Sequence, residues 1–119
     1  MHNYKELIFW QKARILVKEV YELTKSFPES EKYGITSQVQ RSAISIPANI
    51  AEGAGRSSDK DFIRFLNIAT GSAFELETEK ILCLDLNFID EQNCNIILPK
   101  IQEIQKMIYS FKNHFKVKD

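Results

Sequence analysis

The sequence contains few of the residues that build loops, disulfide frameworks and metal sites. Among its 119 residues are four glycines, three prolines, two cysteines and two histidines. Scarce glycine and proline argue against an all-β or loop-rich fold, because such folds use both residues in their turns. Two thiols without motif spacing make neither a disulfide framework nor a metal site, so we expect reduced cysteines in a cytoplasmic protein.

Long hydrophobic runs and an excess of charge of one sign are also lacking. No uncharged apolar run approaches the roughly 18 residues that indicate a transmembrane helix, and no apolar segment follows the polar N-terminus, as a signal peptide requires. Lysine plus arginine equals aspartate plus glutamate, at 16 each. The chain therefore lacks the global positive field that is typical of nucleic-acid binders, and we expect no membrane partner.

Apolar residues recur at helical spacing in four segments, which predicts four amphipathic helices. The first should run from about Glu6 to Ser26. The others should begin after Thr36, Ser58 and Asp90, because these side chains accept hydrogen bonds from free N–H groups at a helix start. Four such helices with short connectors predict an all-α fold, one antiparallel up-down-up-down four-helix bundle over residues 1–119.

Proline and asparagine should shape three of these helices. Pro47 lacks an N–H group and should kink the second helix near Ala43. Asn87 is expected to end the third helix, just after Leu86. Pro99 either kinks the fourth helix or marks where its regular part begins.

Each predicted helix has one apolar stripe that should face a shared core. The stripe of the fourth helix alternates spacings of four and three, the heptad pattern of helices that pack at a shallow angle. The stripes comprise Trp10, Ala13, Val17, Val20 and Thr24; Val39, Ala43, Ile46 and Ile50; Phe62, Leu66, Ala69, Ala73 and Leu76; and Ile97, Ile101, Ile104, Ile108, Phe111 and Phe115.

The second and third helices carry more apolar surface than the core of one bundle needs. At about 100° per residue, apolar side chains also occupy the sides of these helices that point away from the core. Scattered surface hydrophobes have no special meaning, but the same excess on two adjacent helices favours an oligomer interface. Its residues would be Ile44, Pro47, Ala51, Ile63, Phe74 and Ile81.

A polar stripe lies between the core and this second apolar face. Antiparallel packing should bring Glu52 near Arg64, and Arg41 near Glu75 or Glu79. We interpret the stripe as a network that fixes helix register; the alternatives are a ligand-binding groove or an enzyme site that uses Arg41, Glu52 and Glu75. The stripe comprises Arg41, Asn49, Glu52, Arg56, Arg64, Glu75 and Glu79. Four small residues would let the two backbones approach closely: Ala48, Ala69, Gly71 and Ser72.

No catalytic or metal-binding pattern is found in the sequence. Di-iron bundles place a glutamate three residues before a histidine, and neither His2 nor His114 has one there. No pattern places either histidine near Cys83, Cys94 or a serine, as an activated nucleophile would require. We therefore predict no catalytic, cofactor-binding or metal-ligating residue, and a protein that is not an enzyme.

Positive residues gather on the first helix and towards the C-terminus. Taken singly they are ordinary solvated side chains. In a ring of subunits the weak patches would repeat, and their summed potential would then attract a phosphate backbone. The patch would comprise Lys12, Arg14, Lys18, Lys112 and Lys116.

Several motifs point to a known family. Residues 38–56 read QVQRSAISIPANIAEGAGR, residues 10–13 read WQKA and residues 64–72 read RFLNIATGS. With these motifs the chain resembles the four-helix-bundle proteins encoded in intervening sequences of bacterial large-subunit ribosomal RNA genes. The resemblance implies a bundle that assembles into a ring-like homopentamer.

The chain is also similar to the accessory variability proteins of diversity-generating retroelements. Those proteins share the bundle and the ring, are basic, and bind nucleic acid and a reverse transcriptase; the neutral charge of this chain departs from that pattern. The leading prediction is a non-enzymatic homo-oligomer, pentameric by resemblance, that binds RNA or DNA or another protein. The alternative is an oligomeric protein-interaction module without nucleic-acid contact.

Overall fold

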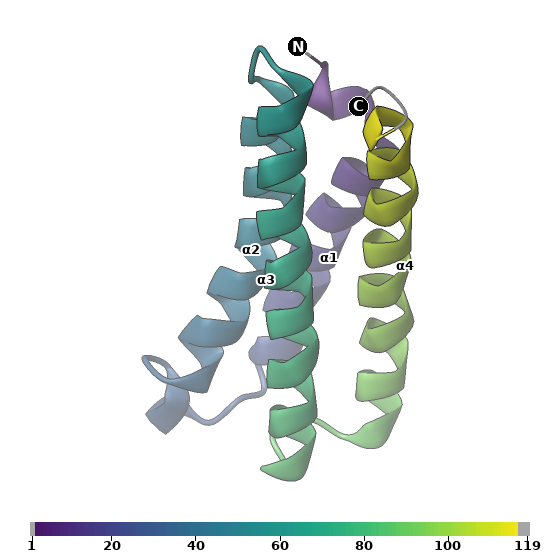
Figure 1. The fold of residues 1–119 in the computed structure, drawn as a ribbon. Helices are drawn as coiled ribbons and strands as arrows, with labels where there is room; N and C mark the ends of the chain where they lie inside the picture. The colour runs from purple at the N-terminus through teal and green to yellow at the C-terminus, as the bar shows by residue number, and fades with distance from the viewer. Residues whose placement is uncertain (1, 117–119) are drawn as a thin grey trace.

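The chain folds into four helices that stand side by side and alternate in direction (Figure 1). The computed structural model describes residues 2–116, with side chains described up to residue 115. Two short 3-10 helices precede the first two α-helices, and residues 2–116 contain no strand, so the predicted all-α bundle is confirmed. The elements are η1 (Tyr4–Glu6), α1 (Ile8–Thr24), η2 (Glu29–Glu31), α2 (Ile35–Ala54), α3 (Asp59–Asp85) and α4 (Glu91–Lys116).

Two of the three predicted helix caps are confirmed. The side chains of Ser58 and Asp90 accept hydrogen bonds from the backbone N–H three residues further on, at 3.1 and 2.8 Å. Thr36 is wrong as a cap, because α2 begins at Ile35, two residues before the predicted start, and the Thr36 hydroxyl oxygen is buried instead.

The end of α3 lies where the sequence predicts it. Asn87 has a positive φ of 64°, a conformation that asparagine tolerates better than most residues. Its N–H donates to the Leu84 carbonyl at 3.1 Å, and the Phe88 N–H donates to the Cys83 carbonyl at 2.9 Å. Together these two bonds make a Schellman motif, which satisfies the free carbonyls at the end of the helix.

The core runs along the bundle axis and contains most of the predicted stripes. The stripe residues of α2 and α3 are all buried, as are the four isoleucines of the α4 stripe. In α1 the first core residue is Phe9 rather than Trp10. Trp10 is half-buried because it packs against Tyr4 of η1, with ring centroids 5.1 Å apart.

The two helix-internal prolines behave differently. Figure 1 shows the first half of α2 diverging from α3 on the N-terminal side of Pro47. This bend agrees with the missing N–H of that proline. The helix α4 instead continues through Pro99 from Glu91, so Pro99 does not mark where the regular helix begins.

Candidate interaction surfaces

A layer of polar side chains joins α2 to α3, and we call Ser42, Ser45, Asn49, Ser72 and Glu75 the polar layer. The Ser42 hydroxyl donates to Glu75 Oε1 at 2.7 Å, and Ser45 and Ser72 share a hydrogen bond of 2.7 Å. The Asn49 amide donates to the carbonyl and the hydroxyl of Ser45, at 2.8 and 2.9 Å. Ser45 follows Ser42 by three residues and Ser72 precedes Glu75 by three, so both interhelical bonds belong to one antiparallel register.

Glu79 continues this layer into the interior. Its side chain is buried, and burial raises its pKa above the ordinary 4.5. Burial has the largest effect on this pKa; the nearby polar side chains of Ser42 and Gln38 lower it, and the nearby charge of Glu75 raises it. Arg41, which the sequence analysis placed beside one of these acids, is exposed and forms no ion pair within residues 2–115.

Glu52, which is predicted to lie near Arg64, does not form an ion pair with it; each side chain pairs with a residue close to it in the sequence. Glu52 of α2 binds Arg56, in the turn that follows α2, at 2.8 Å, and Arg64 pairs with Asp61 within α3 at 3.5 Å. These partners lie three and four residues apart, the separations at which helical side chains meet. Both guanidinium groups also lie over the ring of Phe65, 4.7 and 4.5 Å from its centroid. The four charges therefore pair with near neighbours along the chain, around the turn between α2 and α3.

A glycine sets the closeness of α2 and α3 near this turn. A Cβ atom added to Gly53 would lie 2.7 Å from Phe65 Cβ and 3.0 Å from Phe62 Cδ1. Such distances are shorter than ordinary contacts, so only glycine fits without movement of the helices. Gly71 was also predicted to permit close approach. A Cβ atom added there would meet nothing within 4 Å beyond its own helix and chain neighbours, so Gly71 does not set the helix spacing.

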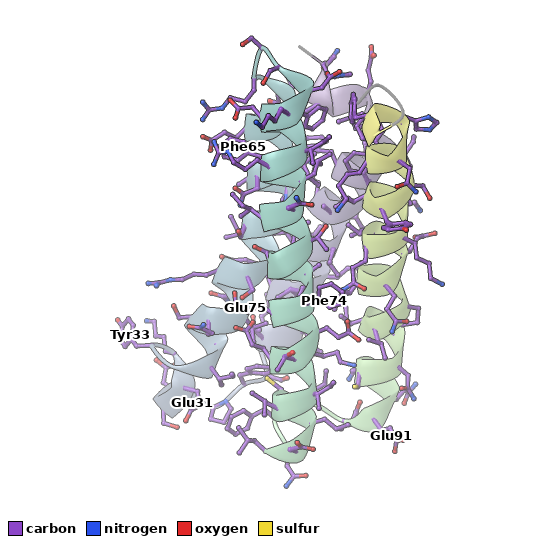
Figure 2. All side chains as sticks on the ribbon, viewed as in Figure 1. Glu31, Tyr33, Phe65, Phe74, Glu75 and Glu91 are labelled. Atoms are coloured by element: carbon purple, nitrogen blue, oxygen red, sulfur yellow. The ribbon has the colours of Figure 1, made fainter. Side chains whose placement is uncertain are left out.

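The six residues predicted to form an oligomer interface lie in two strips. Ile44 is 43% exposed, Phe74 56% and Ile81 46%, and the other three are half-buried. The three of these residues that belong to α3 lie on its side towards α4, where Phe74 lines a pocket with Tyr109. Figure 2 shows Glu75 on the opposite side of α3, towards α2. We call Ile44, Pro47 and Ala51 the α2 strip, and Ile63, Phe74 and Ile81 the α3 strip.

The α2 strip lies away from α3. Ser42, Ser45 and Asn49 mark the side of α2 that contacts α3. At about 100° per residue, Ile44 and Pro47 fall well outside that side. The polar layer therefore separates the two apolar strips, which do not merge into one patch on a single subunit.

The predicted basic patch is divided between two sides of α4. Lys12 forms an ion pair with Glu103 of α4 at 3.2 Å, whereas Lys112 donates to Asn67 Oδ1 of α3 at 2.7 Å. Arg14 and Lys18 are exposed on α1 and form no ion pair within residues 2–115. The side chain of Lys116 lies outside the described residues.

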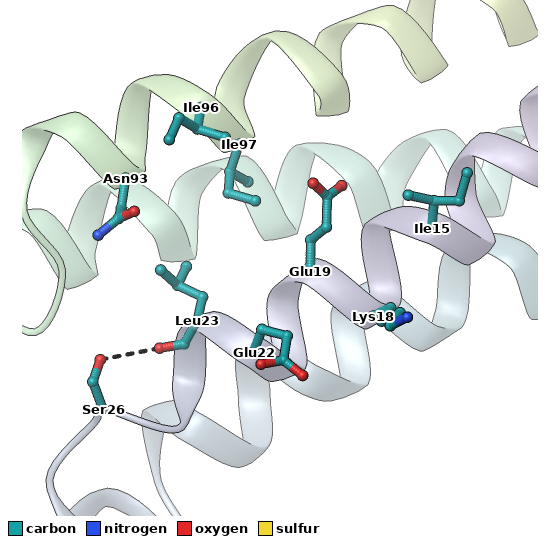
Figure 3. Close-up of a pocket in the computed structure, with 9 residues that line it drawn as sticks. All are labelled: Ile15, Lys18, Glu19, Glu22, Leu23, Ser26, Asn93, Ile96 and Ile97. Carbon is teal, nitrogen blue, oxygen red and sulfur yellow. Dashed lines mark hydrogen bonds between the residues drawn. The ribbon is translucent and has the colours of Figure 1, made fainter.

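An open pocket of about 570 Å³ lies between α1 and α4 (Figure 3). Glu19, on its wall, forms an ion pair with Lys100 of α4. The hydroxyl of Ser26 donates to the Leu23 carbonyl at 3.2 Å. The lining contains two carboxylates, Glu19 and Glu22, and no histidine or cysteine. The lining residues are Ile15, Lys18, Glu19, Glu22, Leu23, Ser26, Asn93, Ile96 and Ile97.

The described residues offer neither a cluster of metal ligands nor a helix suited to crossing a membrane. Residues 2–115 hold no group of three histidine, cysteine, aspartate or glutamate side chains arranged to bind a metal ion. In the same part of the chain, no helix combines the length and apolar character that a bilayer span needs.

The helices and their packing define a four-helix bundle protein. The chain belongs to the 23S rRNA-intervening sequence protein family, whose model matches residues 5–110. This confirms the family resemblance seen in the sequence motifs; the further similarity to retroelement accessory proteins stays a prediction.

A solved structure shares the fold over nearly its whole length. It is a protein with unknown function from the S23 ribosomal protein family of Bacteroides thetaiotaomicron VPI-5482. The two chains are 29% identical, with a TM-score of 0.82, and the match covers 88% of this chain and 98% of the other. No curated protein matches this chain.

Proposed function

We propose that the protein is a non-enzymatic scaffold that assembles into a ring of identical subunits and binds RNA. The observation that carries the proposal is the presence of two exposed apolar strips on different sides of one subunit. A ring needs two different surfaces on each subunit, because every contact joins one surface of a subunit to the other surface of its neighbour. The α2 strip of one copy would pack against the α3 strip of the next, and the resemblance in the sequence implies five copies.

Mixing two damaged subunits tests this arrangement. Ile44→Glu removes the α2 strip and Phe74→Glu removes the α3 strip, so each variant alone should be a monomer by light scattering. An equal mixture should form a dimer, because one intact strip of each kind is still available. The control is Ile15→Glu, at a residue that is 58% exposed but lies in neither strip, and it should keep the full assembly.

Other results would contradict the ring. A monomeric wild-type protein would mean that the strips are ordinary surface. A mixture that stays monomeric would mean that both strips act in one self-complementary interface, which closes a dimer rather than a ring.

RNA binding is the second part of the proposal and is supported by Arg14 and Lys18. Their positive charge has no acidic partner within residues 2–115 and would repeat around the ring. The assembly should gain mass with a short structured RNA at low salt, lose it at higher salt, and lose it after Arg14→Glu with Lys18→Glu. An assembly indifferent to RNA would favour the alternative, a protein-interaction module.

The engaged side chains of the polar stripe support a structural role rather than catalysis. Glu52 pairs with Arg56, and Glu75 accepts a hydrogen bond from Ser42, a contact that suits a network holding α2 against α3. Replacing Glu75 should lower the melting temperature; abolition of a turnover without loss of stability would instead favour the enzyme alternative. The cytoplasm is the proposed setting, since both cysteines are free thiols.

A further inference from the structure

A buried lysine and a buried cysteine face each other between α3 and α4. Lys80 Nζ lies 2.8 Å from Cys94 Sγ, and the two residues are only 4% and 5% exposed. Lys80 lies in the second half of α3, and Cys94 lies in the first turns of α4. The contact therefore joins two helices that are connected by a short turn.

The surroundings of Lys80 are unusual for a buried lysine. A buried ammonium group is normally held by a carboxylate, because an unpaired charge is strongly disfavoured away from water. No carboxylate within residues 2–115 forms an ion pair with Lys80. Its hydrogen-bond partner is the thiol of Cys94. The pair thus places an amine nitrogen against a sulfur atom in a site shielded from water.

We propose that Lys80 and Cys94 form a covalent crosslink when the protein meets hydrogen peroxide. In the first step the thiol takes one oxygen atom from peroxide and becomes a sulfenic acid, and water is released. In the second step the nitrogen lone pair of the Lys80 amine attacks sulfur and the S–O bond breaks. The hydroxide leaves with one amine proton as a second water.

The product is a sulfenamide, an S–N bond that ties α3 to α4. For each crosslink one peroxide is reduced to two waters, and the protein loses two hydrogen atoms. A sulfenic acid condenses with a thiol or a nitrogen nucleophile when one is within reach. The amine of Lys80 is already in contact with the sulfur, and such proximity converts the condensation into a fast intramolecular step.

Peroxide must reach a sulfur that the folded protein shields. Cys94 lies close to the start of α4, next to the connection that ends at Asp90. Helix ends open locally at much lower free energy than the whole fold. Local opening there would admit a molecule as small as peroxide while Lys80 stays on α3.

Cys83 provides a matched control within the same chain. It lies on α3 one turn after Lys80 and is also buried, at 1% exposure. Burial, together with the charge of Glu79, raises the pKa of the Cys83 thiol to about 11. A thiol with a raised pKa is a poor nucleophile towards peroxide, so Cys83 should stay reduced while Cys94 reacts.

The test is mass spectrometry of the whole protein after graded peroxide treatment, followed by peptide mapping. We expect an intact mass lower by two hydrogens, one linked pair of peptides that contain Lys80 and Cys94, and recovery of the starting mass with dithiothreitol. A disulfide between Cys83 and Cys94 would give the same mass, so Cys83→Ser is treated in parallel and should still form the link. Cys94→Ser should not.

Lys80→Met, which keeps the volume of the side chain, should abolish the link and leave Cys94 as a sulfenic or sulfinic acid. Lys80→Gln is the second variant, and circular dichroism confirms that each variant is folded. Three results would overturn the proposal: a link that survives loss of Lys80, a link that disappears in Cys83→Ser, or a wild-type Cys94 that gains oxygen or stays reduced without being linked.

Discussion

Gly53 and Gly71 lie inside α2 and α3, and the space around them differs. A Cβ on Gly53 would lie 2.7 Å from the Cβ of Phe65, whereas a Cβ on Gly71 would meet nothing within 4 Å beyond its own helix and its chain neighbours. Replacement by alanine should therefore change stability in opposite directions. The comparison isolates the close approach of α2 and α3, because the chemical change is the same at both positions.

The expected magnitudes follow from two opposing effects. Alanine is more favourable than glycine inside a helix by about 1 kcal/mol, and this gain applies at both positions. At Gly71 nothing opposes it, so Gly71→Ala should raise the free energy of unfolding by up to about 1 kcal/mol. At Gly53 the obstructing Phe65 atom is fixed to the α3 backbone, and overpacking of this kind costs roughly 1–3 kcal/mol. A cost near the upper end leaves a net loss of about 1–2 kcal/mol.

Urea unfolding followed by circular dichroism measures these differences. All proteins are compared at one subunit concentration, because assembly would stabilise the folded state by mass action. The free energy of unfolding should decrease in the order Gly71→Ala, wild type, Gly53→Ala. If Gly53→Ala proved as stable as Gly71→Ala, the helices would not approach as closely as described, and the reasoning would be refuted.

Substitutions at three further positions, Glu79, Ser42 and Asn87, test the polar contacts between α2 and α3 and the end of α3. Because the pKa of Glu79 in the folded protein is raised above 4.5, the folded state favours the protonated form, and stability is lost as pH rises through the folded value. Glu79→Gln stays neutral, so its free energy of unfolding relative to wild type should rise over that range in urea titrations at several pH values. Ser42→Ala removes a hydrogen bond to a carboxylate and should cost about 1–3 kcal/mol in urea unfolding, whereas the exposed Ser30→Ala should cost almost nothing. Asn87→Ala should lose about 1 kcal/mol, since alanine disfavours a positive φ, and Asn87→Gly should melt at the wild-type temperature or above.

The fold could be predicted because the signals for each helix lie within a short stretch of sequence. The alternation of spacings in α4 and the caps at Ser58 and Asp90 depend only on residues within a turn or two of one another. The first core residue of α1 could not be read in this way, because Trp10 is drawn aside by Tyr4 of η1. That contact depends on how a separate segment folds back on the helix.

Side-chain pairing across helices was harder to predict than helix position. Glu52 pairs with Arg56 rather than with Arg64, because side chains four residues apart at a helix end meet whatever the packing of the helices. The Lys80–Cys94 contact did have a signal in the sequence. The core spacing of α3 at Ala73 and Leu76 continues to residues 80 and 83, which places a lysine at a core position. A charged residue at a core position of such a stripe indicates an unusual buried contact.

The register of α2 against α3 also decides how the surfaces of the subunit are oriented. The Ser42–Glu75 and Ser45–Ser72 bonds share one antiparallel register, so a slide of α2 along α3 would break both. Part-buried polar contacts of this kind contribute little net stability compared with apolar packing, but they penalise alternative arrangements. They therefore fix the side of α2 on which Ile44 emerges. A subunit that loses both bonds should stay helical and fold, yet present its α2 strip at a less defined angle, so assembly should fail before the fold does.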